Sequence, residues 1–376
     1  MGQGIRLGKI AGISLEINYT WFIIFGLLAV TYSTNLFPSL LPAGSPGLMW
    51  IFGVSTAVLL FASIVAHELC HAIFARRRGV ETSSVTLFFF GGVARMTEEP
   101  RTPGAEFEIA AAGPACSFAI AALFGALVVW ARLLNLSDGT IWLFTLAGNL
   151  NLMLGGFNLL PGLPLDGGRI LRALIWWKTG SITRATRAAS ATGQALGYGL
   201  MLIGIIGIFK LAIGPGSGLW MILIGWFLAS AAAASYHQLQ AQRALEGVPV
   251  SKLMTAPVTS VPACATIEDL VQNYFLTHAY TGYPVLDGES VRGVVNVSHV
   301  RDVPRERWPY TTVAEITPPL SPEETLSPDA DGWEALAKMA QGGRPCLLVM
   351  ENGRLLGILS HSDALRLIRT RLQLGV

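Results

Sequence analysis

The chain has 376 residues, of which 52% are hydrophobic and 13% are charged, and its formal net charge is +2. Soluble domains carry about 25% charged residues, so this composition favours a membrane protein. The small net charge, without a basic run interleaved with aromatic residues, argues against nucleic acid as a partner.

The organisation of the chain changes near Leu245. Before this point long apolar stretches alternate with short polar loops, and after it the pattern is that of a soluble α+β domain. We predict a membrane domain over 1–245 and a soluble domain over 248–376. No small-residue cleavage site follows a short apolar core near the N-terminus, so we expect no cleavable signal peptide. The scattered cysteines, without a CxxC pair, favour free thiols in a reducing compartment.

Six apolar stretches approach the length of about 20 residues that a helix needs to cross a bilayer. They are Trp21–Phe37, Met49–Phe74, Ile109–Ala131, Ile141–Phe157, Ala195–Ile213 and Leu219–Ser235, with a shorter apolar piece at Ile170–Trp177. Arginine and lysine gather before the first stretch and after the second and fourth. By the positive-inside rule, we expect a multi-pass protein of the plasma (inner) membrane, with both termini and the soluble domain in the cytoplasm.

Two segments interrupt this pattern of spans. Leu87–Gly92 is apolar but has the length of a strand, and it ends in Gly91 and Gly92. Asn158–Gly168 contains prolines and glycines that forbid a continuous helix. Irregular backbone at membrane depth is tolerated where it is buried in protein or lines a wet cavity. Both segments are therefore candidate walls of a site, although an ordinary hairpin loop would also explain the first.

The second apolar stretch contains the motif H-E-x-x-H, formed by His67, Glu68 and His71. On a helix the two histidines lie on one face, one turn apart, where both imidazoles reach one Zn²⁺ at about 2.0–2.1 Å. Glu68 lies beside the metal and is placed to take a proton from a metal-bound water. In this composition, chance would produce the pattern roughly 0.006 times per chain. Polar and ionisable residues of this kind raise the free energy of a membrane helix, so their presence there indicates a functional site.

A catalytic zinc site uses three protein ligands and a water molecule. The best candidate for the third ligand is Asp166, the sole acidic residue between Asp138 and Glu246. Its flanking glycines allow a close approach of the backbone to the helix that carries the histidines. The alternative is that Asp166 caps the helix that begins near Gly168.

Asn158 opens the same broken segment. A buried amide there would hydrogen-bond a substrate backbone or a developing oxyanion. It would equally satisfy the loop carbonyls that the nearby prolines leave without a donor.

Together these motifs resemble the site-2 protease family of intramembrane zinc metalloproteases. The resemblance rests on His67-Glu68-Leu69-Cys70-His71, Gly91-Gly92, Ala112-Gly113-Pro114 and Asn158…Pro161…Pro164…Asp166-Gly167, and it covers about residues 1–240. It implies a zinc metalloendopeptidase that cuts membrane-spanning proteins within the lipid bilayer. It also implies one Zn²⁺ per chain held by His67, His71 and Asp166, with Glu68 as the acid/base. The strand over Leu87–Gly92 would pair with an unwound substrate by edge addition.

The soluble domain contains an internal repeat, over about 248–305 and 311–372. Each copy has an amphipathic helix, around Glu268–His278 and Trp333–Gln341, then two short apolar strands about a tight turn and another helix. The repeat resembles a pair of CBS modules. This resemblance implies an adenine nucleotide between the repeats, gripped by Ser360 and Asp363 in the second copy, and a homodimer formed through the pair. In the first copy Asn296 and His299 replace the gripping residues, which leaves that site in doubt. A dimerisation module without a ligand is the alternative.

Other classes of protein also fit parts of this pattern. The main alternative is a membrane transporter or channel regulated by CBS modules, in which the histidines and Asp166 bind a transported metal. A transporter does not need Glu68, so a Glu68→Gln variant separates the two functions. An inactive scaffold is a third interpretation, which the intact motif argues against.

Overall fold

The computed structural model describes residues 5–10, 12–80, 82–88, 91–96, 100–209, 215–277, 280, 282–288 and 290–374. Contacts within the chain divide it into two compact units, Met1–His237 and Gln238–Val376. The domain limits of 1–245 and 248–376 that the sequence indicates stay a prediction.

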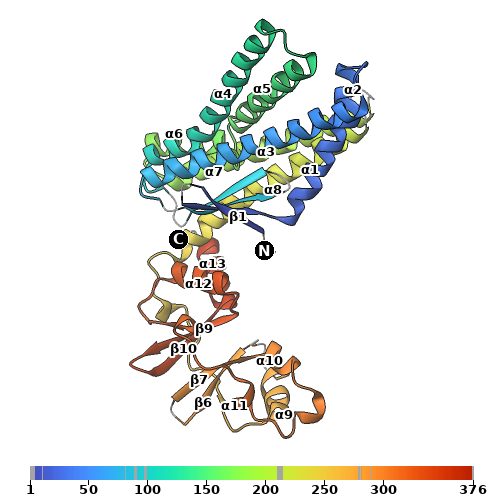
Figure 1. Cartoon of the computed structure of the whole chain (residues 1–376). Helices are drawn as coiled ribbons and strands as arrows, with labels where there is room; N and C mark the ends of the chain where they lie inside the picture. The colour runs from blue at the N-terminus through green and yellow to red at the C-terminus, as the bar shows by residue number, and fades with distance from the viewer. Residues whose placement is uncertain are drawn as a thin grey trace. The chain divides into compact units, whose positions relative to one another are not determined.

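Long helices dominate the first unit (Figure 1). Their bounds are α1 Tyr19–Thr31, η1 Tyr32–Leu36, α2 Phe37–Leu40, α3 Pro46–Arg77, α4 Pro103–Leu133, α5 Asp138–Asn158, α6 Asp166–Thr179, α7 Ile182–Phe209 and α8 Pro215–Leu245. In the described part of the chain, six helices are long and apolar enough to cross a membrane. This finding confirms the predicted polytopic α-helical fold.

The helices extend further than the apolar windows that predicted them. The fifth candidate span begins at Ile182, well before the predicted Ala195, because the intervening alanine- and arginine-rich segment also favours a helix. Local signals fix several starts: Ser45 and Thr102 accept hydrogen bonds from backbone N–H groups of the first turns of α3 and α4, and each is followed by proline. Such caps satisfy donors that the first turn leaves without partners.

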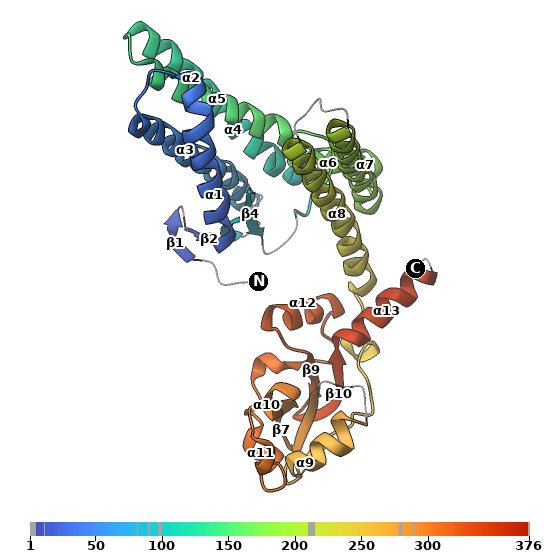
Figure 2. The ribbon, with the colours of Figure 1, turned by 90° about the vertical axis from the view of Figure 1, so that its right-hand side faces the viewer.

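A small sheet accompanies the helices, with strands β1 Ile5–Ile10, β2 Ile13–Ile17, β3 Thr82–Phe88 and β4 Gly91–Met96 in that order. β2 pairs with β3 in parallel, and the other two pairings are antiparallel. β4 therefore lies at an edge of this sheet, beside α3 (Figure 2). The structure divides the predicted strand Leu87–Gly92 between β3 and β4, whose two-residue connection lies outside the described residues.

α3 is the element around which the first unit is organised. It packs against α1, α4, α5, β3 and β4, and α4 also packs against α5 and α6. The helix that carries the H-E-x-x-H motif therefore packs against β4 and against α4, which in turn packs against α6.

The second unit consists of two copies of one arrangement. The first copy contains β5 Val261–Pro262, α9 Ile267–Leu270, η3 Val271–Phe275, β6 Gly282–Asp287, β7 Ser290–Asn296 and α10 Val297–Arg301. The second contains β8 Thr325–Leu326, α12 Gly332–Gly342, β9 Cys346–Glu351, β10 Arg354–Ser360 and α13 His361–Leu374. In each sheet a short first strand runs parallel to the middle strand, which pairs antiparallel with the last. The last residues of α8, Ala244 and Leu245, are buried in the core of the second copy.

Candidate metal centre

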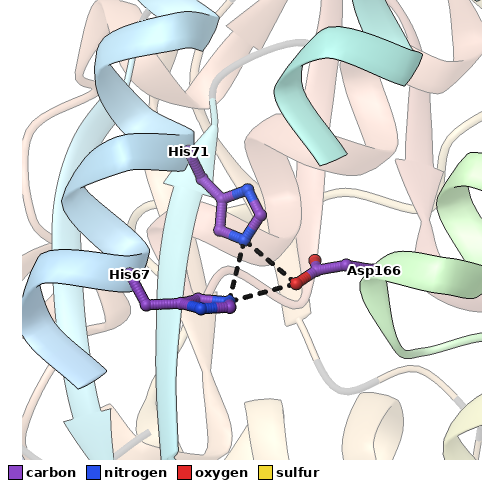
Figure 3. Close-up of side chains that lie close together, drawn as sticks. All are labelled: His67, His71 and Asp166. Atoms are coloured by element: carbon purple, nitrogen blue, oxygen red, sulfur yellow. Dashed lines mark hydrogen bonds and ion pairs between the residues drawn. The ribbon is translucent and has the colours of Figure 1, made fainter. Parts of the chain in front are cut away.

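Two histidines on α3 face the same point inside the first unit (Figure 3). His67 and His71 are each 3% exposed, and their Nε2 atoms lie 3.2 Å apart. The i, i+4 spacing on a helix places the two rings one turn apart on one face. This part of the predicted geometry follows from local structure alone.

Asp166 comes to the same point from α6 (Figure 3). Its Oδ2 lies 3.1 Å from Nε2 of His67 and 3.2 Å from Nε2 of His71, and the residue is 8% exposed. Asp166 is the first residue of α6, and the N-cap position belongs to Leu165, which makes no capping bond through its side chain. The carboxylate is therefore turned to the histidines rather than to the end of its own helix.

The glycines after Asp166 permit this approach. A Cβ atom added at Gly167 would lie 2.2 Å from the carbonyl oxygen of Leu159, and one at Gly168 would lie 2.2 Å from the backbone of Gly162. Any larger residue would push α6 away from the irregular loop before it. The Gly-Gly pair thus holds the first turn of α6, and Asp166 with it, close to α3.

The second nitrogen of each imidazole is held by α4. Nδ1 of His71 donates to the backbone carbonyl of Ile109 (2.6 Å), because a carbonyl can only accept. Nδ1 of His67 hydrogen-bonds with the hydroxyl of Ser117 at 2.9 Å. Such partners orient metal-binding histidines and fix which nitrogen carries the proton. Here they leave both Nε2 atoms available on the side of Asp166.

The donor set fits a zinc ion. Tetrahedral ligands at about 2.0 Å from Zn²⁺ stand about 3.3 Å from one another, close to the observed separations of 3.1–3.2 Å. Among the described histidine, cysteine and acidic residues, these three form the one group of three or more whose ligand atoms lie close enough to share an ion. Gly113 of α4 leaves space at the two Nε2 atoms, because a Cβ atom added at this position would lie 2.2 Å from Nε2 of His71.

Glu68 belongs to α3, and its side chain projects toward the edge strand β4. It is half-buried, and its side chain faces Gly92 of β4, where an added Cβ atom would lie 2.5 Å from its Cγ. Gly91 opens the same strand and pairs with Phe88. The structure thus places Glu68 beside the strand that ends the sheet order.

Asn158 is the last residue of α5, and its amide donates to the carbonyl of Leu154 one turn earlier (2.9 Å). This hydrogen bond is internal to the helix. The oxyanion role considered from the sequence stays a prediction.

In the second unit, Ser360 is the last residue of β10 and Asp363 lies in the first turn of α13. The Ser360 hydroxyl donates to Oδ2 of Asp363 (2.6 Å), while Oδ1 accepts from the Thr255 hydroxyl (3.0 Å) and from Arg366 (2.8 Å). Both residues line a cavity of about 200 Å³ that also has Tyr280 from the first repeat on its wall. Burial, together with the nearby Glu324 carboxylate, raises the pKa of the Cys346 thiol, another residue of this wall, to about 11.

Sequence reasoning did not find Ser117 and Ile109, the two partners of the imidazoles. Ile109 contributes its backbone carbonyl, and every residue type has one, so the sequence does not reveal this role. Ser117 follows the Gly113-Pro114 pair by one turn of α4 and was not distinguishable from other helix serines. Its position one turn after Gly113, which the resemblance did single out, is the signal that would have found it.

Comparison with known proteins agrees with these observations. The profile of peptidase family M50 matches residues 55–136 and 133–203, and that of the CBS domain matches 250–306 and 313–370. Rip3 of Mycobacterium tuberculosis is 38% identical over 98% of this chain and 93% of its own length. Zinc metalloprotease MJ0392 of Methanocaldococcus jannaschii is 31% identical over 97% of this chain and 96% of its own. The solved site-2 protease from the same organism is 31% identical, with 62% of this chain and 95% of that chain covered and a TM-score of 0.43.

Proposed function

Because this chain belongs to peptidase family M50, the site-2 protease family of zinc metalloproteases, and carries tandem CBS domains, we propose that it hydrolyses peptide bonds of membrane-spanning protein substrates. The observation that carries this proposal is the convergence of His67, His71 and Asp166 within 3.2 Å, with Glu68 beside them. The family implies zinc as the cofactor, and six candidate spans make the chain a multi-pass membrane protein.

His67, His71 and Asp166 would hold one zinc ion per chain. When bound, zinc polarises a peptide carbonyl and lowers the pKa of a bound water molecule to about 7. The burial of the three ligands excludes bulk water from the centre, which strengthens the electrostatic interactions there. The hydrogen bonds that His71 and His67 form with the Ile109 carbonyl and the Ser117 hydroxyl keep both imidazoles in position to act.

Glu68 would act as the general base and then as the general acid. Its position on α3, next to His67 in the chain, places its carboxylate beside the ligands rather than among them. It would accept a proton from the attacking water and pass it to the leaving amine nitrogen. A group that moves protons in this way contributes about 10²–10⁴-fold to a rate.

β4 would present the substrate to Glu68. A helical substrate hides its carbonyls in its own hydrogen bonds, so it must unwind before hydrolysis. An unwound segment would add to the outer edge of β4, the last strand in the described sheet, as a further strand, with backbone hydrogen bonds for affinity. The small Gly91 and Gly92 would let the segment approach Glu68 closely.

The test combines metal analysis with a cleavage assay. Purified wild-type protein should contain about one zinc per chain and cut a membrane-spanning substrate in detergent or nanodiscs. Asp166→Ala should lose the metal, whereas Glu68→Gln should keep it and lose cleavage by at least about 10²-fold. Full cleavage by Glu68→Gln would rule out Glu68 as the acid/base. A wild-type protein that binds the metal but cuts no substrate would favour a metal transporter instead.

We infer the orientation in the membrane from the distribution of charge. Arginine and lysine are concentrated in the loops after α3 and around α6, so by the positive-inside rule these loops and both termini would lie in the cytoplasm. Reporter fusions at the C-terminus test this orientation: an enzyme that is active only in the cytoplasm should be active there. Activity of a reporter that works only outside the cytoplasm would reverse the assignment.

The CBS pair would bind an adenine nucleotide in the cavity beside Ser360 and regulate cleavage. Both carboxylate oxygens of Asp363 are engaged, so its role would be to orient the hydroxyls of Ser360 and Thr255 toward the ligand. The pair follows α8 directly, so nucleotide binding would shift this helix and change access to the centre. Cleavage rates with and without millimolar ATP or AMP test the idea, and unchanged rates would remove the regulation.

A further inference from the structure

A buried ion pair connects α4 with α6 close to the metal centre. Arg172 of α6 donates through Nε to Oε1 of Glu106 on α4 (2.5 Å), and its Nη2 contacts the same oxygen. Glu106 is fully buried and Arg172 is 8% exposed. From the sequence Arg172 is one of several cations after the fourth span, but the structure buries it, unlike the exposed Lys178 on the same helix.

The two residues lie next to elements of the metal centre. Glu106 stands in the first turn of α4, one turn before Ile109, whose carbonyl accepts from His71. Arg172 stands on the same short helix as Asp166. The ion pair therefore links the segment that orients one candidate ligand to the helix that supplies another.

Stability alone does not account for this pair. Replacing a buried ion pair by apolar side chains of similar size is often neutral or stabilising, because removing two charges from water is costly. Glu106 also lies in the candidate span Pro103–Leu133, where ionisable residues are rare and mark functional sites. A planar guanidinium that directs two N–H donors at one carboxylate restricts the relative position of the two helices more tightly than apolar packing does.

We propose that Glu106 and Arg172 are positioning residues that set the distance between His71 and Asp166, and through it the zinc affinity of the centre. This inference rests on the proposed function, because it takes the three side chains as zinc ligands. The pair would act through Ile109, one turn further along α4, and through α6, which carries Asp166. Partners of this kind typically change metal affinity by about 10–100-fold when they are removed.

The experiment uses the purified full-length protein and four variants. Arg172→Met removes the cation, Glu106→Leu/Arg172→Met removes both charges, Arg172→Lys keeps the charge without the planar fork, and Lys178→Met is the matched control. Zinc affinity is measured by competition with a chelator. The visible spectrum of Co²⁺-loaded protein reports the ligand geometry, and circular dichroism with thermal melting reports the fold.

We expect the double variant to fold as the wild type does, to bind zinc at least about tenfold more weakly and to show an altered Co²⁺ spectrum. Lys178→Met should match the wild type in all three measurements. A folded double variant with wild-type affinity and spectrum would overturn the inference. If the double variant does not fold, Arg172→Lys decides: weaker affinity supports the positioning role, and unchanged affinity and spectrum overturn it. A wild-type protein without zinc would instead reject the proposed function itself.

Discussion

Gly113 of α4 lies directly against the ring of His71: a Cβ atom added at position 113 would stand 2.2 Å from His71 Nε2 and 2.5 Å from His67 Nε2. No rotation of a methyl group relieves contacts of this kind, because the Cβ position is fixed by the backbone. The absence of a side chain at this point keeps α4 close enough for Ile109 and Ser117 to reach the Nδ1 atoms on the other side of the rings.

Gly113→Ala should therefore displace the histidines from their present positions. We expect the zinc affinity to fall at least about tenfold and the stability to fall by about 1–3 kcal/mol from overpacking. Metal analysis and thermal melting of the purified protein measure the two effects. Gly125→Ala on the same helix is the control, since an added Cβ there meets nothing within 4 Å. Wild-type zinc content in Gly113→Ala would contradict this view of the centre.

Gly92→Ala should separate turnover from metal binding. The added Cβ atom would lie 2.5 Å from Cγ and 3.3 Å from Oε1 of Glu68, so the carboxylate has to move. A displaced general base loses on the order of 10²-fold in rate. Cleavage should fall by about this factor while the zinc content stays at the wild-type level. Loss of zinc together with activity would show that Gly92 supports the ligands rather than Glu68.

Ser117→Ala removes the hydrogen-bond partner of His67 Nδ1. Without it the imidazole keeps its packing but is less firmly oriented, so we expect zinc affinity to fall by about tenfold. Thr145→Val serves as the control, because that hydroxyl donates to the carbonyl of Ile141 in its own helix. Chelator competition gives the affinities. An unchanged value for Ser117→Ala would assign the serine a packing role alone.

Asp331→Ala should destabilise the second unit. Oδ1 of Asp331 accepts from the backbone N–H groups of Trp333 and Glu334, and Oδ2 accepts from that of Gly247 at 2.6 Å. Losing an N-cap carboxylate costs about 0.5–2 kcal/mol, and the bond to Gly247 adds to this loss. Thermal or denaturant unfolding of the purified chain measures the change. Asp329 is exposed, so Asp329→Ala should leave the midpoint of the unfolding transition unchanged. Equal losses of stability in the two variants would contradict the capping role of Asp331.

The two cysteines of the second unit should differ in reactivity with pH. Burial raises the pKa of Cys346 to about 11, so at pH 8 its reactive thiolate fraction is on the order of 10⁻³. Labelling of Cys346 by iodoacetamide should therefore be slow at pH 7–8 and accelerate about tenfold for each pH unit up to about 11. The exposed Cys264 should be labelled readily at pH 8. Peptide mapping by mass spectrometry follows both sites, and equally fast labelling of Cys346 at pH 7 would contradict its burial.

The sequence predicts those features that depend on local spacing or on scarcity. His67 and His71 are placed on one face by the helical period, and Asp166 stands out as an isolated acidic residue in a proline- and glycine-rich segment. The apolar stretches locate the spans, although helix ends are set by capping residues such as Ser45 and Thr102, which hydropathy does not register.

Other features depend on contacts between distant segments and have no local signature. The N-terminal hairpin β1–β2 was not predicted, although Ile13, Leu15 and Ile17 alternate with polar residues over the length of a short strand. Its parallel pairing with β3 is a tertiary contact. The ion pair of Glu106 and Arg172 joins residues 66 positions apart, and in the sequence Arg172 is indistinguishable from its basic neighbours.

The separation of the candidate ligands along the chain also bears on biogenesis. Asp166 follows His67 by 99 residues, so α4, α5 and the loop before α6 must all be synthesised and inserted before the third ligand exists. A nascent or truncated chain that ends before α6 offers only the histidine pair, which holds a divalent ion far less well than the complete set. The chain would thus become able to hydrolyse peptide bonds only after α6 has been inserted and the helices have assembled. Incomplete chains would not cut neighbouring membrane proteins.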